Sequence, residues 1–352
     1  MPGKKSAALW LEKARTAGRE AGAAWREGSG AGAESGAESG AGAVPGPAAG
    51  LKHFREALFG WFAGFHQAKR PSFAEALSQG LVFRDGYAGS SGLQPEQLGA
   101  PVPLAGTASV VISVSDEEET IGRLLDELQR LPLQEIIVVL NGCTDHSFAE
   151  VRKRSGILMV NDPQRLGHDV GRSIGAALAG GDAVLFLDGD MAVPAEELAA
   201  FLYEQESGAD VVLNNITGFL PVYGRQDEVS RCKLFLNQAL GRPDLHSNSL
   251  TAVPHVLSRR TLSHIGTSVL AVPPKAQAAA VLAGLHVTAP CTVDVIRRNR
   301  LRQSNSGSHN KVAQLIIGDH AEALGEAIRR RGPRLHWTSL PRAELAKVRN
   351  GR

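Results

Sequence analysis

The sequence is poor in cysteine and has no long apolar run. Its three cysteines, Cys143, Cys232 and Cys291, are odd in number and far apart, so they indicate neither a disulfide framework nor a zinc site. The N-terminal stretch MPGKKSAALWLEKARTAG lacks a signal-peptide core, and no run reaches the roughly 18 apolar residues of a membrane span. We therefore expect a cytoplasmic protein, either free or peripheral to the inner face of the membrane.

A strong charge of either sign is also absent. The 38 Lys and Arg residues nearly balance the 36 Asp and Glu residues, which leaves a formal net charge of +2. This balance argues against a nucleic-acid partner, which would need a basic surface. The hydrophobic content of 43% is that of a globular protein, and 352 residues are enough to bury a full core.

Residues 1–103 differ in composition from the rest and predict a helical extension. Residues 4–27 and 51–69 have helical periodicity, whereas residues 28–50 are rich in Gly, Ala and Ser and predict a flexible linker. A second linker, rich in Gly, Pro and Ser, is expected at 84–103.

The helix expected at 51–69 has an apolar face made of Phe54, Leu58, Trp61, Phe62 and Phe65. This face predicts packing on the main domain or on a second copy of the chain, which would make a homo-oligomer through the N-terminal helices. Binding of the helix to a membrane surface is the alternative, although the helix has few cationic residues.

From Ala108 onward, apolar strands alternate with helices. Such alternation predicts an α/β fold with a mostly parallel sheet and helices on both faces. The expected strands are 108–115, the stretch EIIVVLNGCTDHS at 135–147 that ends in an Asn-Gly turn, 157–160, and the apolar run 183–187 that leads into the acids. The helices between them are expected at 116–131, 147–156 and 167–181. Because ligands bind beyond the carboxyl ends of such strands, the polar strand ends should line one cleft.

Two carboxylates follow the apolar run AVLFL. Asp188 and Asp190 are separated by one glycine and leave the strand on the same loop. Carboxylates in this arrangement can both reach one Mg²⁺ or Mn²⁺, and the ion can bridge to substrate phosphates. The alternative is that they are ordinary turn or capping acids.

Three stretches, in this order, resemble family 2 glycosyltransferases of the GT-A fold. They are SVVISVSDEEETIGRLLDEL, EIIVVLNGCTDHS and GHDVGRSIGAALAGGDAVLFLDGDM, and the resemblance covers about residues 108–215. It implies a GT-A-like (Rossmann-like) fold that binds a nucleoside diphosphate sugar and a divalent metal. The layout also has some likeness to glucosyl-3-phosphoglycerate synthases, which are retaining enzymes.

The resemblance also implies site residues at the matching positions. Nucleotide contacts would come from Ser113, Val114, Ser115 and Glu117, and a base-side turn from Asn141, Gly142 and Asp145. Gly167, Gly171 and Arg172 would border the diphosphate, and Asp188 and Asp190 would hold Mg²⁺ or Mn²⁺. From the residues alone, Glu117 and Asp145 can equally be helix-start acids, Gly167 and Gly171 close-packing residues, and Arg172 a surface cation.

The chain also departs from the family pattern. Leu140 stands where the second turn usually carries an acid, and Asp116 stands where the first strand is usually followed by Asn. Pro273 and Pro274 occupy about the place of the Glu-Asp pair that many inverting members use, and proline cannot accept a proton.

Three explanations remain for the missing acid pair. The enzyme retains configuration and needs no such base, another acid such as Asp244, Asp294 or Asp319 replaces it, or the chain binds without turnover. We expect Asp190 and Asp319 to be the catalytic acids. His320 is the expected third metal ligand, in preference to His286 and His309, although a capping role for Asp319 and His320 is the alternative.

The sequence thus predicts a GT-A-like domain at 104–325, with a nucleotide-sugar half at 108–215 and an acceptor half at 216–325, followed by a basic tail at 326–352. The expected reaction moves a sugar from a nucleoside diphosphate sugar to an acceptor, which is a small molecule, a lipid-linked molecule or a glycan. The alternatives are an inactive protein of this fold that binds a nucleotide sugar or acts as a scaffold, and a nucleotidyltransferase. The acids in SDEEET disfavour the nucleotidyltransferase, because a triphosphate needs cations at that place.

Overall fold

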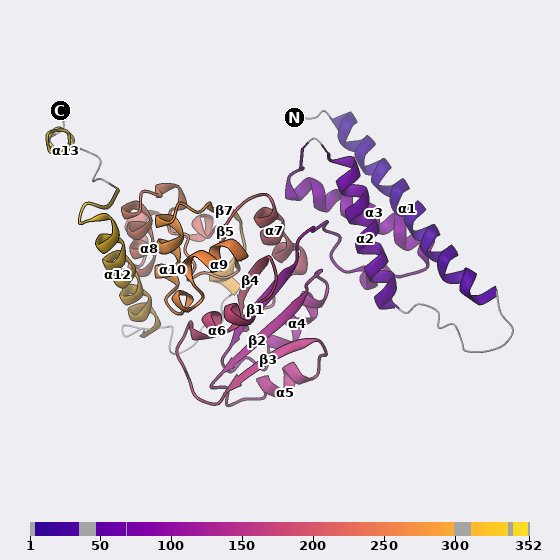
Figure 1. The fold of residues 1–352 in the computed structure, drawn as a ribbon, viewed down its shortest axis with the longest axis horizontal. Helices are drawn as coiled ribbons and strands as arrows, with labels where there is room; N and C mark the ends of the chain where they lie inside the picture. The colour runs from indigo at the N-terminus through magenta and orange to yellow at the C-terminus, as the bar shows by residue number, and fades with distance from the viewer. Residues whose placement is uncertain (1–3, 35–46, 68, 299–310, 337–340, 351–352) are drawn as a thin grey trace. The chain divides into compact units, whose positions relative to one another are not determined.

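The computed structural model describes residues 4–34, 47–67, 69–298, 311–336 and 341–350 (Figure 1). The chain folds as two compact units. One comprises residues 1–106, 126–133 and 194–207, and the other comprises residues 107–125, 134–193 and 208–352. None of the described helices is long and apolar enough to cross a membrane.

The first unit is helical. It contains α1 (Lys4–Glu34), α2 (Pro47–Phe65), α3 (Phe73–Ser91), the short helix η1 (Pro95–Leu98) and α7 (Ala195–Glu206). The predicted apolar face of α2 packs inside this unit, where Phe54 and Leu58 share a core with Phe83 and Tyr87 of α3. The unit therefore supplies its own cover for most of that face.

Glycines let α1 and α3 approach closely. A Cβ atom on Gly18 would lie 2.1 Å from the carbonyl oxygen of Phe83, and one on Gly86 would lie 2.4 Å from that of Arg15. The backbones of the two helices are thus in direct contact, and a side chain at either glycine would push them apart.

Both predicted linkers are shorter than expected. Helix α1 continues to Glu34 and α2 begins at Pro47, so the prediction of a linker is wrong at both ends of 28–50, while 35–46 lies outside the described residues. Residues 84–91 belong to α3, which ends at Gly92 with a φ of 80°. Burial of Phe83 and Tyr87 offsets the low helix propensity of the glycines there.

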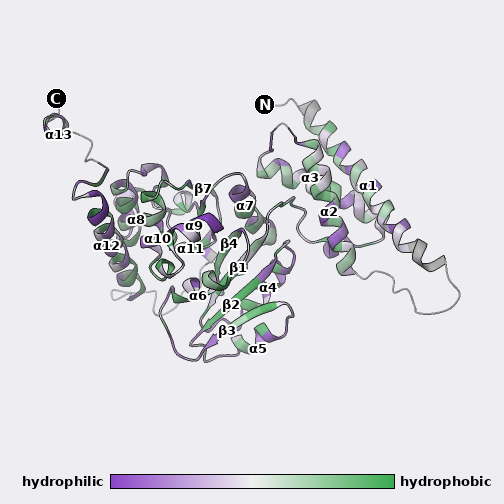
Figure 2. Ribbon diagram, in the orientation of Figure 1, coloured by the Kyte–Doolittle hydropathy of each residue, from purple (hydrophilic) through white to green (hydrophobic). Residues whose placement is uncertain are grey.

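The second unit is built on a mostly parallel sheet. Its seven strands among the described residues run in the order β3-β2-β1-β4-β6-β5-β7, and only β6 is antiparallel to its neighbours. The strands are β1 (Ala108–Val114), β2 (Glu135–Asn141), β3 (Ile157–Asp162), β4 (Ala183–Asp188), β5 (Val211–Asn214), β6 (His255–Ser258) and β7 (Val287–Cys291). The strands β1, β2 and β4 consist mostly of buried hydrophobic residues, and hydrophobic residues are green in the ribbon of Figure 2.

Helices connect and cover these strands. They are α4 (Ile121–Gln129), α5 (Ser147–Arg152), α6 (Val170–Leu178), α8 (Glu228–Ala239), α9 (Arg259–Ile265), α10 (Pro273–Leu282), α11 (Val295–Arg298), α12 (Lys311–Arg331) and α13 (Arg342–Arg349). Short 3₁₀ helices lie at Thr217–Phe219, Tyr223–Arg225, Pro243–Leu245 and Ser268–Ala271. Helix α12 therefore extends into the stretch predicted as a basic tail, and it packs on α8 and α10.

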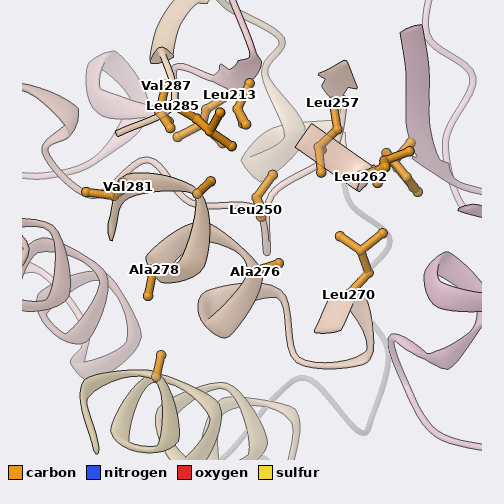
Figure 3. Close-up of a cluster of buried hydrophobic side chains, with 14 of the residues drawn as sticks. Leu213, Leu250, Leu257, Leu262, Leu270, Ala276, Ala278, Val281, Leu285 and Val287 are labelled. Carbon is orange, nitrogen blue, oxygen red and sulfur yellow. The ribbon is translucent and has the colours of Figure 1, made fainter. Parts of the chain in front are cut away.

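One apolar core joins the sheet to the later helices. Leu213, Leu257 and Val287 of the sheet face Ala276 and Val281 of α10 (Figure 3). The mostly parallel GT-A-like α/β fold and the N-terminal helical extension that the sequence predicts are thus both confirmed.

Candidate functional site

The carboxyl ends of three neighbouring parallel strands bring the predicted site residues to one edge of the sheet. In the pairing of β1 with β4, Ser113 lies opposite Asp188, and in the pairing of β1 with β2 it lies opposite Val139. Asn141 ends β2 on the same edge. The sequence predicted this grouping correctly, because parallel strands end at a common edge.

Asp116 ties the turn after β1 to the turn after β2. Its Oδ1 atom accepts a hydrogen bond of 2.6 Å from the backbone N–H of Thr144, and its Oδ2 atom lies 2.6 Å from Nη2 of Arg165. The hydrogen bond from Thr144 is the main cause that lowers the pKa of the Asp116 carboxyl. Asp116 has a φ of 61°, a left-handed conformation that aspartate tolerates better than most residues.

Asp145 and Glu117 meet at the same pair of turns. Asp145 accepts hydrogen bonds from the backbone N–H groups of Glu118 and Ser147, each at 2.9 Å, and Ser147 Oγ accepts one from the N–H of Glu117. Burial acts to raise the pKa of Asp145, but these hydrogen bonds outweigh it and leave the pKa lowered. The carboxylate therefore stays charged while it holds the two turns together.

Asn141 fixes the segment that leads into α6. Its Oδ1 atom accepts a hydrogen bond from the N–H of Leu166 at 2.8 Å, and its Nδ2 atom donates one to the carbonyl of Gly167 at 2.6 Å. Gly142 has a φ of 63°, and a Cβ atom there would lie 2.8 Å from the backbone nitrogen of Arg165. Only glycine fits this turn without displacing the segment.

Arg172 is the most buried charge at this edge. Its side chain is 3% exposed, Nη1 lies 2.7 Å from Oδ1 of Asp169, and Nη2 lies 3.2 Å from both carboxylate oxygens of Asp188. Burial acts to lower the pKa of Arg172, but Asp188 and Asp169 more than compensate, so the guanidinium keeps its charge. Arg172 is thus a buried ion-pair residue and not the surface cation that the sequence left open.

Hydrogen bonds hold the turn that carries Asp188 and Asp190. The N–H of Gly189 donates to the carbonyl of Ser113 at 2.9 Å, and Thr120 Oγ1 donates to the carbonyl of Gly189 at 2.6 Å. The side chain of Asp188 remains 31% exposed beside its ion pair. The turn is therefore fixed at its centre, with an acid on each side of that centre.

This donor set suits a hard divalent cation. Mg²⁺ or Mn²⁺ needs only one or two carboxylates from the protein, because phosphate oxygens and water complete its shell. Ser113 Oγ, next to Asp188 across the strands, is buried and has no hydrogen-bond partner among the described residues. A polar ligand bound at this edge would satisfy that hydroxyl.

His320 does not join the aspartates as a third ligand. Among the described residues, the one group of three side chains that could hold a metal ion, with ligand atoms within 4.8 Å of one another, is Asp116, Cys143 and Asp145. The two aspartates of this group already accept hydrogen bonds from the backbone of the turns. His320 is buried on α12, where Nδ1 lies 2.6 Å from the carbonyl of Ile316 and burial lowers its pKa to about 4. The imidazole is therefore neutral, with its proton on Nδ1, and its Nε2 atom is the unprotonated hydrogen-bond acceptor.

Asp319, the neighbour of His320, has a raised pKa of about 6. Burial is the main cause, and the negative charges of Asp169 and Glu322 add to it. The carboxylate of Asp319 therefore interacts with that of Asp169 at the start of α6, and Asp169 also forms an ion pair with Arg172. A carboxyl that titrates near neutrality can exchange a proton with a substrate.

The other two acids considered as a base in the acceptor half, Asp244 and Asp294, each have a partner in the structure. Asp244 forms an ion pair of 2.6 Å with Arg242, and the hydrogen bonds from Arg242 lower its pKa. Asp294 accepts a hydrogen bond from the N–H of Arg297 at the start of α11. Pro273 and Pro274 form the buried first turn of α10, a place that suits proline because its missing N–H would be unsatisfied there.

The sequence model of glycosyl transferase family 2 matches residues 109–260, which include every predicted nucleotide and aspartate-pair residue. This segment has the sequence pattern of glycosyltransferase family 2. The resemblance found in the sequence is thereby confirmed, and the match supports a transferase. No curated protein matches the chain.

Several solved structures are similar in fold. Glucosyl-3-phosphoglycerate synthase from Mycobacterium tuberculosis with Mn²⁺, UDP and phosphoglyceric acid is 20% identical, with a TM-score of 0.48, over 63% of this chain and 79% of that one. The same enzyme with Mg²⁺ and UDP is 18% identical, with a TM-score of 0.47, over 63% and 80% of the two chains.

Sequence reasoning missed the partners of Arg172. Asp169 precedes Arg172 by three residues, a spacing that places two side chains on one face of a helix, so the pattern DVGR carried a detectable signal. The carbonyl of Leu250 accepts a hydrogen bond from Arg172 and the N–H of Leu250 donates one to Gln277. Leu250 lies 78 residues after Arg172 in the chain and Gln277 lies 105 residues after it, so neither gave such a signal.

Proposed function

We propose that this protein transfers a sugar from a nucleoside diphosphate sugar to an acceptor, with a divalent cation on the diphosphate. The observation that carries the proposal is the Asp188–Asp190 turn. It lies at the carboxyl edge of the sheet, is held by hydrogen bonds from Gly189 and Thr120, and belongs to a family 2 segment. When bound, Mg²⁺ or Mn²⁺ would neutralise the charge that builds up on the departing diphosphate.

The chain's own residues have separate parts in this proposal. Asp190 and the exposed side of Asp188 would hold the cation, while Arg172 keeps Asp188 in one orientation. Ser113, Val114, Ser115, Glu117, Asn141, Gly142 and Asp145 would line the nucleotide. Asp319, whose pKa is about 6, would accept or donate a proton on the acceptor side.

In this proposal the donor is a nucleoside diphosphate sugar, which the aspartate pair and the family 2 segment support. The proposed acceptor is a small molecule, a lipid-linked molecule or a glycan. We also propose a cytoplasmic protein.

A second candidate, a nucleotide-sugar-binding protein without turnover, is favoured by one observation. The place where many inverting members carry an acid pair is a buried proline turn, Pro273–Pro274, at the start of α10. Such a protein would still bind a nucleoside diphosphate with Mn²⁺ but would not consume a nucleotide sugar.

The test is binding followed by turnover. A thermal-shift screen of nucleoside diphosphates with and without Mn²⁺ should give a manganese-dependent stabilisation, which amounts to about 2.7 kcal/mol at a ligand concentration of 100 Kd. Asp190→Ala should lose the manganese dependence, and Asp85→Ala, which removes an exposed acid on α3, is the matched control.

A nucleotide-sugar panel with Mn²⁺ then separates the two candidates. Release of nucleoside diphosphate by the wild-type protein, but not by Asp190→Ala, supports a transferase. Manganese-dependent binding without release supports the binding protein. If Asp190→Ala binds nucleoside diphosphates as the wild type does, Asp188 and Asp190 are turn acids and the proposal fails.

A further inference from the structure

The segment between the 3₁₀ helix at Pro243–Leu245 and β6 is irregular but deeply buried. Ser247, Asn248, Ser249 and Leu250 are each at most 2% exposed. A buried segment without regular structure must find partners for its backbone N–H and C=O groups elsewhere. In this protein, side-chain amides from two helices supply part of them.

Gln277 is one of these amides. It is 1% exposed and lies in the otherwise apolar stretch AQAAAVL of α10. Its Oε1 atom accepts a hydrogen bond from the N–H of Leu250 at 2.9 Å, and its Nε2 atom donates to Oδ1 of Asn237 at 2.7 Å and to the carbonyl of Asn248 at 3.3 Å. Gln277 therefore fixes the position of Leu250 through its backbone.

Leu250 in turn contacts Arg172. The carbonyl of Leu250 accepts a hydrogen bond of 3.2 Å from Nη1 of Arg172, the same nitrogen that pairs with Asp169. The buried Nε atom of Arg172 has no hydrogen-bond partner in the described part of the chain. The plane of the guanidinium is thus set by its two Nη groups alone, and Leu250 is one of their three partners.

We propose that Gln277 is a positioning residue for Asp188. It holds Leu250, Leu250 orients the planar guanidinium of Arg172, and Arg172 directs the carboxylate of Asp188 toward the cation. The proposal rests on the proposed function, because it assigns to Asp188 the task of holding a divalent ion. Groups that orient a metal ligand typically change metal affinity 10- to 100-fold when they are removed.

The test compares Gln277→Met with a matched variant, Asn214→Leu. Asn214 is also fully buried and makes three hydrogen bonds, with the carbonyl groups of Val253 and Val293 and the N–H of Val293, none of which leads to Arg172. Each variant loses three buried hydrogen bonds, so both should lower the melting temperature. Gln277→Glu, which keeps an acceptor for the N–H of Leu250, serves as the conservative variant.

Two readouts decide the matter. Isothermal titration with Mn²⁺ in the presence of UDP should show affinity reduced roughly tenfold for Gln277→Met, less reduced for Gln277→Glu and unchanged for Asn214→Leu. A crystal structure of ligand-free Gln277→Met should show a displaced Arg172–Asp188 pair. Equal affinity losses in Gln277→Met and Asn214→Leu would overturn the proposal, as would an unmoved pair.

The two failures can be told apart. If the wild-type protein binds no Mn²⁺ with any nucleoside diphosphate, the proposed function fails. In that case the crystal structure of Gln277→Met still decides whether Gln277 sets the orientation of Asp188.

Discussion

Arg172 on α6 and Asp188 at the end of β4 form an ion pair in which Nη2 lies 3.2 Å from both carboxylate oxygens. The arginine is 3% exposed and the aspartate 31% exposed, so the pair reaches from the interior to the surface of the site. The ion pair links α6 to the end of β4, where the turn with Asp188 and Asp190 begins. The proposed site and the stability of the second unit therefore depend on the same contact.

Removing the arginine should be costly. Arg172→Met leaves Asp169, which is 7% exposed, without its cation, and breaking a buried ion pair from one side typically costs roughly 3–5 kcal/mol. The double variant Asp169→Asn/Arg172→Met should lose less than Arg172→Met alone, because it removes the stranded charge. Urea unfolding followed by circular dichroism measures both. If Arg172→Met lowers the unfolding free energy by less than about 1 kcal/mol, the ion pair contributes no more than a solvent-exposed one and the prediction is wrong.

Acid should destabilise the fold partly through His320. Burial lowers its pKa to about 4, whereas an unfolded chain has an ordinary histidine near 6.5. Between these values the unfolded state binds the extra proton, so the contribution of His320 is complete above pH 6.5 and is lost as the pH falls toward 4. The largest slope from one such group is about 1.4 kcal/mol per pH unit.

His320→Leu should therefore flatten the pH dependence of the unfolding free energy between pH 6.5 and 4. His264→Gln, at an exposed position on α9, is the control and should leave the slope as it is. His255, whose burial lowers its pKa to about 3, keeps part of the slope in both variants. Identical slopes for His320→Leu and the wild type would contradict this prediction.

The turn after β1 should tolerate Asn better than Ala at position 116. Asp116→Asn keeps an acceptor for the N–H of Thr144 and suits the φ of 61°. Asp116→Ala loses the acceptor and adds the strain of a left-handed alanine, about 1–2 kcal/mol. Equilibrium unfolding should rank the wild type first, Asn second and Ala last. The prediction fails if Ala is as stable as Asn.

The contact between α1 and α3 should not accept a side chain at Gly18. A Cβ atom there would lie 2.1 Å from the carbonyl of Phe83, so Gly18→Ala must separate the helices, at a typical cost of about 1–3 kcal/mol. Gly28→Ala on the same helix meets nothing within 4 Å and should raise stability by roughly 0.5–1 kcal/mol. Thermal unfolding of the two variants compares them directly, and a stabilised Gly18→Ala would show that the helices can separate freely.

Local pattern predicted some of this site and not the rest. The positions of Asp188 and Asn141 follow from apolar strands that end in polar residues, because parallel strands share an edge. The ion pair of Arg172 with Asp188 depends on the packing of α6 against β1 and β2, and its bond to Leu250 depends on α10. Contacts across such sequence distances leave no periodic trace in one chain.

In the helical extension, residue composition predicted too little regular structure. Composition alone marked residues 28–50 and 84–103 as linkers, since both are rich in glycine. In the structure, Gly86 is a contact surface for α1, and Gly92 ends α3. Glycine occurs both in flexible linkers and where two helices pack closely, so the residue type alone does not show which of the two applies. The packing helix α1 identifies Gly86 as a contact residue.

The short antiparallel strand β6 has a consequence for the order of folding. Strands β1 to β4 pair among themselves, but β4 meets the rest of the sheet only through β6, which is made some 65 residues later. During synthesis, the edge of β4 therefore stays open until His255–Ser258 leaves the ribosome. The pairing of β4 with β6 joins the two parallel blocks, and β7 is added to β5 only after it. A nascent chain that stops before β6 therefore leaves the apolar strand β4 with an unpaired edge.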